Sequence, residues 1–284
     1  MRQRTLAREV KLEGAGLHTG QPCRLRLGPA PPDSGWQLRR VDVRPPVTIP
    51  VGPQAVVAAP RCTALGVDGV QVMTVEHLFA ALSGLAVDNV AIEVDGPEVP
   101  ALDNSALPFV QAVLEAGLQD QPAPRRVRRL RRAVWVLEAE RGQMAVAMPC
   151  HELRVAYAFV SDRPALEDQY GEFAVRPQTF ARELAPARTV AFLDEVQELR
   201  RRGLGLGGTA DSVVLVGPQG CAGPLRFADE VVRHKILDLV GDLALAGAVR
   251  ARVLAVRSGH RLHHQLARRI LQESLLEPEG MEAP

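Results

Sequence analysis

The stretch RHKILDLVGDLALAG, residues 233–247, sets four ionisable side chains after Arg233 in a segment that is otherwise apolar on nearly every side. Its pattern predicts a helix that the fold buries. The four are His234, Lys235, Asp238 and Asp242. Because an unpaired charge is costly to remove from water, each of them must meet a partner or a ligand. This helix therefore bears on both the fold and the site.

A second stretch repeats the same order of elements. TVEHLFAALSGLAVDNVAIEV (74–94) predicts a helix, a glycine and an alternating strand, and so does HKILDLVGDLALAGAVRARVLAV (234–256). Such an order is common, so chance explains the pair too. If the repeat is genuine, the fold is α+β, with two similar domains that are each a small sheet packed with helices. Facing helices would then bring together one histidine from each half.

Length and composition favour two ordinary domains. The chain has 284 residues, 46% of them apolar, and a formal net charge of +1. Residues 120–124 are polar and proline-rich, so we expect a first domain over 1–122 and a second over 123–284. The nearly balanced charge argues against a nucleic-acid partner.

The sequence shows neither a signal peptide nor a membrane span. It starts with the polar MRQRTLAREVKLEG, and nowhere do about 18 apolar residues follow one another. We expect a cytoplasmic monomer that at most rests on a membrane surface. Four widely spaced cysteines without a C-x-x-C pair indicate neither a disulfide framework nor a thiolate zinc site.

The first candidate site is a metal site. Helix positions four apart lie on one face, so His234 and Asp238 point the same way and can share one small cation. Two or three nitrogen and oxygen ligands plus water are typical of catalytic zinc. His77 is the candidate third ligand from the other half, with Thr74 as the expected N-cap of its helix. Glu76 projects about 100° away from His77, which suits contact with a metal-bound water.

The second candidate pair is Asp242 with His260. Asp242 lies one turn beyond Asp238, too far for an obvious ligand, and suits holding another side chain in place. His260 follows the last predicted strand through Ser258 and Gly259, where catalytic residues commonly project. The plainer alternatives are that His234 and Asp238 form a surface pair or a satisfied core pair, and that His260 is an exposed loop histidine.

Seven segments, in order over residues 2–272, closely resemble the UDP-3-O-acyl-N-acetylglucosamine deacetylase (LpxC) family of lipid A synthesis. They are GAGLHTG (14–20), TVEHLFAAL (74–82), ALDNSALPF (101–109), ARTVAFL (187–193), RGLGLGG (202–208), RHKILDLVGDL (233–243) and SGHRL (258–262). The resemblance implies a two-domain α+β fold with the active site between the halves. It also implies hydrolysis of the N-acetyl group, with release of acetate and UDP-3-O-acyl-glucosamine, in a Gram-negative bacterium.

The resemblance implies one zinc ion per chain, held by His77, His234 and Asp238, with Fe²⁺ as an alternative because similar ligands accept both. It makes Glu76 the general base that activates water.

The resemblance implies four further roles. Thr189 would donate a hydrogen bond to the oxyanion, and Lys235 would supply positive charge to the substrate or the oxyanion. His260 would be the cationic partner that assists amine departure or contacts the diphosphate, oriented by Asp242.

An inserted segment near residues 190–217 is implied to form an apolar passage for the acyl chain. The chain departs from the family pattern at three positions. Asn104 stands where glycine is usual, and since Asn tolerates a left-handed backbone we expect the turn to be kept. Val190 replaces an aromatic residue, which could change the preferred acyl length, and His263 replaces an asparagine.

The segment RRVRRLRR, residues 125–132, holds six arginines in eight positions. A solvated face between the domains is the plain explanation. Contact with the anionic inner-membrane surface, where a lipid-linked substrate gathers, is the alternative hypothesis.

Two other functions compete with the deacetylase. One is a related zinc amidohydrolase that acts on another acylated amino sugar. The other is a non-catalytic binding protein that uses the arginine segment, which would predict loss of a ligand or of the base, yet all of them are present.

Overall fold

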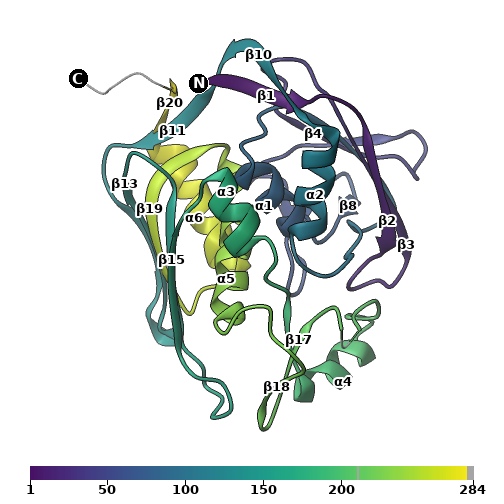
Figure 1. Cartoon of the computed structure of the whole chain (residues 1–284), viewed down its shortest axis with the longest axis vertical. Coiled ribbons are helices and arrows are strands. Elements are labelled where there is room, and N and C mark those ends of the chain that lie inside the picture. Colours follow the sequence, from purple (N-terminus) through teal and green to yellow (C-terminus); the bar gives the residue numbers. More distant parts are fainter. Residues whose placement is uncertain (210, 280–284) are drawn as a thin grey trace.

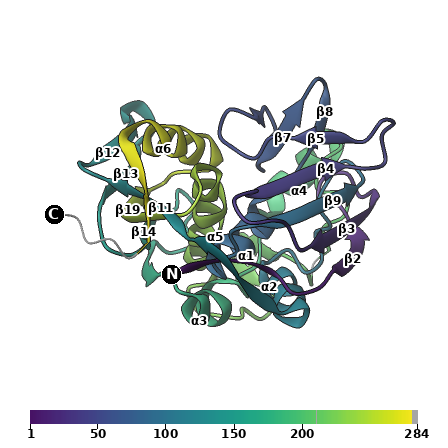
Figure 2. The same ribbon diagram turned by 90° about the horizontal axis from the view of Figure 1, so that it is seen from above.

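The computed structural model describes residues 1–209 and 211–279 and places helices between two outer sheets (Figures 1 and 2). The first sheet has the order β2-β3-β9-β4-β5. Its strands are β2 (Val10–Ala15), β3 (Pro22–Gly28), β9 (Val90–Asp95), β4 (Trp36–Arg40) and β5 (Val47–Ile49). Along β3, Cys23, Leu25 and Leu27 are buried and alternate with exposed residues, so one face meets the core.

The first half also contains two helices and a small sheet. The helices are α1 (Glu76–Gly84) and α2 (Leu107–Ala116). The sheet has the order β6-β7-β8, from β6 (Val56–Val57), β7 (Ala64–Val67) and β8 (Val70–Val72).

The second sheet has seven strands and β19 (Val249–Val256) at its centre. The order is β12-β13-β19-β11-β20, with β14 also paired to β19 and β15 paired to β14. These strands are β11 (Arg126–Leu130), β12 (Val134–Glu138), β13 (Gln143–Pro149), β14 (Arg154–Phe159), β15 (Gln169–Ala174) and β20 (Ser274–Pro278). The helices α5 (Glu230–Leu243) and α6 (His260–Glu273) cover its inner face (Figure 2).

Helices α1 and α5 pack directly against each other at the centre of the molecule. Gly241 makes this approach possible, because a Cβ atom there would stand 2.1 Å from the carbonyl oxygen of Glu76. The two helices that carry the predicted metal ligands are therefore in contact.

A smaller unit sits at one end of the molecule, below the helices in Figure 1. It consists of β16 (Val190–Phe192), α4 (Leu193–Arg201), β17 (Val214–Gly217) and β18 (Gly220–Ala222), with strand order β16-β17-β18. The remaining helical turns are α3 (Pro177–Thr179), η1 (Ala139–Arg141), η2 (Phe180–Leu184) and η3 (Ala244–Ala246).

The α+β class and the two similar halves are confirmed, including a helix, a glycine and a strand in each half. The predicted N-cap of α1 is wrong. The helix begins after Val75, and Thr74 donates its hydroxyl to Glu98 at 2.7 Å instead. Helices α2 and α6 lie outside the elements that the sequence predicted.

The stretch expected to separate the domains is a strand. Residues 118–124 form β10 (Leu118–Pro124), which pairs with β1 (Arg2–Leu6) in a two-stranded ribbon. The division into 1–122 and 123–284 stays a prediction. Within residues 1–209 and 211–279, none of the helices is long and apolar enough to cross a membrane.

Candidate active site

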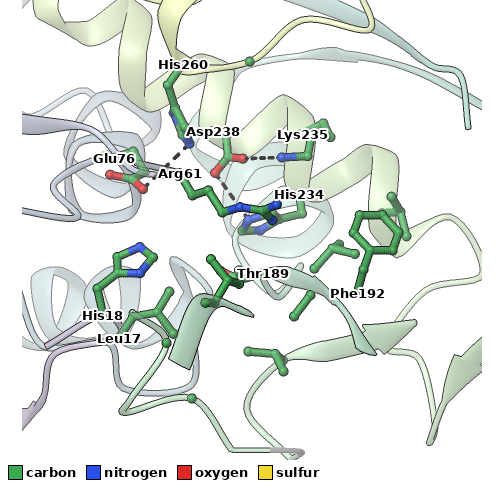
Figure 3. A pocket seen from close by; sticks show the side chains of 18 of the residues that line it. Leu17, His18, Arg61, Glu76, Thr189, Phe192, His234, Lys235, Asp238 and His260 are labelled. Carbon is green, nitrogen blue, oxygen red and sulfur yellow. Dashed lines mark hydrogen bonds and ion pairs between the residues drawn. The ribbon is translucent and has the colours of Figure 1, made fainter. Parts of the chain in front are cut away.

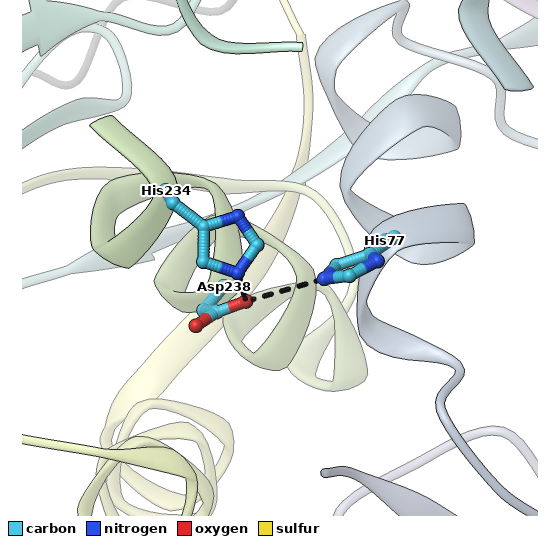
Figure 4. Close-up of side chains that lie close together, drawn as sticks. All are labelled: His77, His234 and Asp238. Carbon is cyan, nitrogen blue, oxygen red and sulfur yellow. Dashed lines mark ion pairs between the residues drawn. The ribbon is translucent and has the colours of Figure 1, made fainter. Parts of the chain in front are cut away.

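His77, His234 and Asp238 converge between α1 and α5 (Figure 4). One ligand atom from each lies within 4.8 Å of the others. Asp238 Oδ1 is 3.3 Å from Nε2 of His234 and 3.6 Å from Nε2 of His77. All three side chains are buried. The spacing of four residues on α5 and the packing of α1 on α5 together build this cluster.

The protonation states of His234 and Asp238 favour the binding of a cation. Burial lowers the pKa of His234 to about 4, so its imidazole is neutral at pH 7. Its Nδ1 lies 3.1 Å from the carbonyl oxygen of Ala187, which leaves Nε2 with its lone pair directed at the cluster. Burial alone would raise the pKa of Asp238, but the Lys235 ammonium, the hydrogen bond from His77 and the charge of His260 hold it well below its usual range. A neutral imidazole and an ionised carboxylate are the forms that bind metal.

Glu76 lies next to the cluster at the start of α1 and is 3% exposed. Its Oε2 accepts a hydrogen bond from the main-chain N–H of Thr63 at 3.0 Å, and its Oε1 lies 4.0 Å from Nε2 of His260. Burial raises the pKa of Glu76, although His260 and His77 oppose the shift. A carboxylate with a raised pKa is a stronger proton acceptor than an ordinary one.

Asp242 is the centre of a hydrogen-bonded group on the other side of Glu76. Its Oδ2 lies 2.8 Å from Nδ1 of His260 and 2.8 Å from Nδ1 of His263, and its Oδ1 accepts the hydroxyl of Thr63 at 2.5 Å. His264 completes the group, with Nε2 2.8 Å from the Thr63 hydroxyl. Asp242, His260 and His263 are close enough to hold a cation, but these contacts already occupy the carboxylate.

The partners of Asp242 differ in charge. Burial alone would lower the pKa of His260, but Asp242 and Glu76 raise it to about 10, so the ring is an imidazolium at pH 7. Burial lowers the pKa of His263, so it stays neutral, donating through Nδ1 to Asp242 and accepting from the Ser258 hydroxyl at 2.9 Å.

Lys235 and Thr189 line the same cavity (Figure 3). The ammonium of Lys235 donates to Asp238 Oδ2 at 3.0 Å. The hydroxyl of Thr189 donates to the carbonyl oxygen of Asn104 at 3.1 Å. Asn104 has a φ of 59°, as predicted for an asparagine in place of glycine.

The cavity has a volume of about 680 Å³ and reaches from the metal cluster to the unit of β16 to β18. Its far part is apolar, with side chains from β16, α4 and β17. They are Val190, Ala191, Phe192, Leu193, Val196, Leu199 and Leu215. The predicted passage segment 190–217 therefore lines this part, and the unit itself extends to Ala222.

The sequence matches a family of known enzymes. Residues 3–272 match the LpxC family, described as UDP-3-O-acyl N-acetylglycosamine deacetylase. The chain belongs to the LpxC family. This confirms the predicted resemblance. LpxC proteins are metalloenzymes, and the buried His–His–Asp cluster is a group of side chains that could hold a metal ion.

Relatives of this LpxC chain carry the name UDP-3-O-acyl-N-acetylglucosamine deacetylase. The protein of Myxococcus xanthus (strain DK1622) is 40% identical over 274 residues, covering 95% of this chain and 87% of that protein. The protein of Nostoc sp. (strain PCC 7120) is 42% identical over 278 residues, covering 95% and 99%. That of Actinobacillus succinogenes is 38% identical over 279 residues, covering 96% and 91%.

Two members of the LpxC site escaped the sequence analysis. Thr63 comes from the loop before β7, and His264 from the second turn of α6. A histidine four residues after His260 on a helix was the available signal for His264. Nothing local pointed to Thr63, because its contacts reach Glu76, Asp242 and His264 across the fold.

The arginine segment 125–132 makes mainly internal contacts. Arg125 pairs with Asp88 of the first half at 2.9 Å, and Arg132 pairs with Glu273 at 2.7 Å. Arg129 lies 3.4 Å from Glu277, and Arg128 donates to the carbonyl oxygen of Ala246 at 2.6 Å. The segment thus stabilises the fold through at least four of its six arginines.

Proposed function

We propose that the chain hydrolyses the N-acetyl group of UDP-3-O-acyl-N-acetylglucosamine and releases acetate and UDP-3-O-acyl-glucosamine, a step of lipid A biosynthesis. The observation that carries this proposal is one cavity with the His77–His234–Asp238 cluster and Glu76 in one part and an apolar arm in the other. Family membership supports the same reaction.

We assign one Zn²⁺ to His77, His234 and Asp238, with Fe²⁺ as the alternative. The neutral His234, the ionised Asp238 and the convergence of the three side chains support the assignment. When bound, the ion supplies a Lewis acid that lowers the pKa of water from about 15.7 to about 7 and polarises a carbonyl oxygen.

Glu76 acts as the general base. It removes a proton from the water that attacks the acetamide carbonyl carbon, and its raised pKa suits it to hold that proton. The Thr63 N–H fixes one carboxylate oxygen, while the other faces His260.

His260 is the cationic partner, and Asp242 keeps it protonated and oriented. When the bond between the carbonyl carbon and the amide nitrogen breaks, the imidazolium supplies a proton to the departing amine. A contact between the same ring and the substrate's diphosphate is the second role open to it.

Thr189 and Lys235 stabilise negative charge on the substrate, and Thr189 does so by turning its hydroxyl proton from the carbonyl oxygen of Asn104 to the substrate. Their hydroxyl and ammonium groups line the cavity beside the cluster, where donors offset the charge that develops on the carbonyl oxygen. The apolar arm takes the acyl chain, and Val190 in its wall affects the preferred chain length.

A related amidohydrolase acting on another acylated amino sugar is the second candidate, favoured by Val190 and His263. We further propose that the chain works as a cytoplasmic monomer, with domains over 1–122 and 123–284, and that it touches the inner-membrane surface.

Acetate release tests the proposal. Purified protein is incubated with UDP-3-O-acyl-N-acetylglucosamine before chelation, after chelation and after zinc is added back. We expect release that chelation abolishes and zinc restores. Release only from a different acylated amino sugar would favour the second candidate, and a folded, metal-loaded protein without turnover on either would favour the binding protein.

A further inference from the structure

Glu98 is a fully buried carboxylate to which the proposed function gives no role. It lies in the connection between β9 and α2, and 0% of its surface is exposed. The main-chain N–H groups of His18 and Thr19 donate to it at 2.9 Å each. The hydroxyls of Thr19 and Thr74 donate to it at 2.8 and 2.7 Å. These donors come from two segments that are distant in the sequence, and such a set of donors is what a buried carboxyl group requires.

The first of the two segments leads into α1. Thr74 has a φ of 57°, a left-handed backbone that a β-branched residue rarely adopts and keeps only where its surroundings hold it. Its hydroxyl bonds to Glu98, and the main chain of the preceding Met73 is paired with the residues on either side of Glu98. Glu76 and His77 follow closely on α1. The position of these two side chains therefore depends on how Thr74 is held.

The second segment is the loop of residues 16–19. Gly16 lies so close to Glu98 that a Cβ atom there would stand 2.2 Å from Oε2, so the loop rests directly on the carboxylate. Leu17 and His18 of this loop line the same cavity as Glu76 (Figure 3). The place of the loop in the cavity wall therefore depends on Glu98.

The loop 16–19 in turn supports a second loop, residues 205–208, in the connection between α4 and β17. The N–H of Gly207 donates to the carbonyl oxygen of Leu17 at 3.1 Å. A Cβ atom on Gly207 would stand 2.2 Å from the carbonyl oxygen of Gly16, so the two main chains are in direct contact. Gly205 and Gly208 line the cavity, and α4 and β17 supply side chains of its apolar arm. A shift of the loop 16–19 would thus reach the apolar arm.

We propose that Glu98 is a positioning residue that joins the two parts of the cavity. Through Thr74 it fixes the start of α1, with Glu76 and His77, and through the loop 16–19 it fixes the loop 205–208 beside the apolar arm. A carboxylate suits this place because both of its oxygens accept hydrogen bonds, whereas an amide offers one acceptor and one donor group. The roles of Glu76 as base and of the arm as acyl site rest on the proposed function.

Two valine substitutions separate the two directions. Thr74→Val keeps the shape of the side chain and removes the hydroxyl that bonds to Glu98. We expect kcat to fall about 10- to 100-fold on short-acyl and long-acyl substrates alike, because the base and a metal ligand are displaced. Thr19→Val removes the other hydroxyl, and we expect kcat/KM to fall about tenfold on the long-acyl substrate only. Acetate release at several substrate concentrations measures both constants.

Two further variants serve as controls. Thr74→Ser retains the hydroxyl and should keep the kcat of the unaltered chain. Thr5→Val is the matched control for stability, because Thr5 is 4% exposed, against 3% for Thr74, and its hydroxyl accepts from the N–H of Ala30. Thr5 lies on β1, outside the lining of the cavity. Thr5→Val should therefore lower stability in urea unfolding and leave kcat and KM unchanged on both substrates.

Glu98→Gln should combine the two effects. Whichever way the amide turns, its NH₂ group faces a main-chain N–H of His18 or Thr19, so the side chain must move and its bond to Thr74 shifts with it. Both the loss of kcat on the two substrates and the added loss on the long-acyl substrate should appear. If Glu98→Gln does not fold, the two valine variants still decide the question.

Two binding measurements require no turnover and keep this proposal distinct from the proposed function. Zinc affinity should fall in Thr74→Val and not in Thr19→Val, because His77 lies on α1. Binding of dodecanoate to the metal-free protein, measured by calorimetry, should weaken in Thr19→Val and not in Thr74→Val. This pattern in a chain that releases no acetate would remove the deacetylase and leave the role of Glu98 intact.

Three outcomes overturn the role of Glu98. Kinetics of Thr74→Val and Thr19→Val that match those of Thr5→Val would make the contacts of Glu98 a matter of stability alone. Equal losses by Thr74→Val and Thr19→Val on both substrates would show that the two segments do not act on separate parts of the cavity. A folded Glu98→Gln that matches only one of the two valine variants would show that Glu98 serves one part alone.

Discussion

Gly241 of α5 lies so close to the carbonyl oxygen of Glu76 in α1 that a Cβ atom would stand 2.1 Å from it. This contact joins the helix of His234 and Asp238 to the helix of His77. The distance between the proposed metal ligands of the two halves therefore depends on a residue that has no side chain.

Replacing this glycine should disturb stability and the metal site together. Gly241→Ala forces α1 and α5 apart, and we expect a loss of about 1–3 kcal/mol in the free energy of unfolding, as for other overpacked cores. Metal affinity should fall in parallel. Urea unfolding and metal analysis after dialysis measure both, with Gly28→Ala as the control because a Cβ there meets nothing within 4 Å. Unchanged metal content in a destabilised Gly241→Ala protein would contradict the coupling.

Substitutions should distinguish the role of a metal ligand from that of the general base. His234→Ala should lose the bound metal and turnover together, because one of three protein ligands is gone. Glu76→Gln should keep the metal while acetate release falls about 10²- to 10⁴-fold, the usual contribution of a general base. Metal analysis and acetate release on the same samples decide this. Near-normal turnover by Glu76→Gln would exclude it as the base.

His260 should stay protonated well above neutral pH. Its folded-state pKa is raised from 6.5 to about 10, with Asp242 as the main charge that favours the imidazolium. The stabilisation is therefore complete below about pH 6.5 and is lost as the pH rises through about 10. NMR titration of the ring checks the pKa, and urea unfolding at several pH values checks the stability.

Asp242→Asn is the matched variant for this titration. It removes the charge that favours the imidazolium, so the pKa of His260 should drop and the alkaline loss of stability should begin at lower pH. If the pKa of His260 stayed near 10 in Asp242→Asn, a group other than Asp242 would be responsible for keeping His260 protonated.

Chain-length preference should respond to the wall of the apolar arm. Val190 lines the cavity, and Val190→Phe narrows it. We expect kcat/KM for a long-acyl substrate to fall about tenfold, in the range that a changed hydrophobic pocket provides. The kcat/KM for a short-acyl substrate should be unchanged, so that substrate serves as the internal control. Equal losses on both substrates would indicate damage to the site rather than a shorter passage.

The sequence by itself determined the features that depend on local periodicity. The spacing of four residues put His234 and Asp238 on one face of α5, and alternation predicted the strands that follow α1 and α5. The resemblance of seven segments determined the family. These features are readable because backbone hydrogen bonding gives helices and strands a fixed repeat along the chain.

Only the tertiary structure decided which distant residues meet. The packing of α1 on α5 brought His77 to within 3.6 Å of Asp238, and the loop with Thr63 reached both Glu76 and Asp242. The surroundings of Trp135 were also decided by the tertiary structure. Alternation along its strand predicts that one face is exposed, but it does not predict which residues of neighbouring strands lie next to Trp135. Such contacts depend on how side chains from separate elements pack together, and this packing produces no periodic pattern in the sequence.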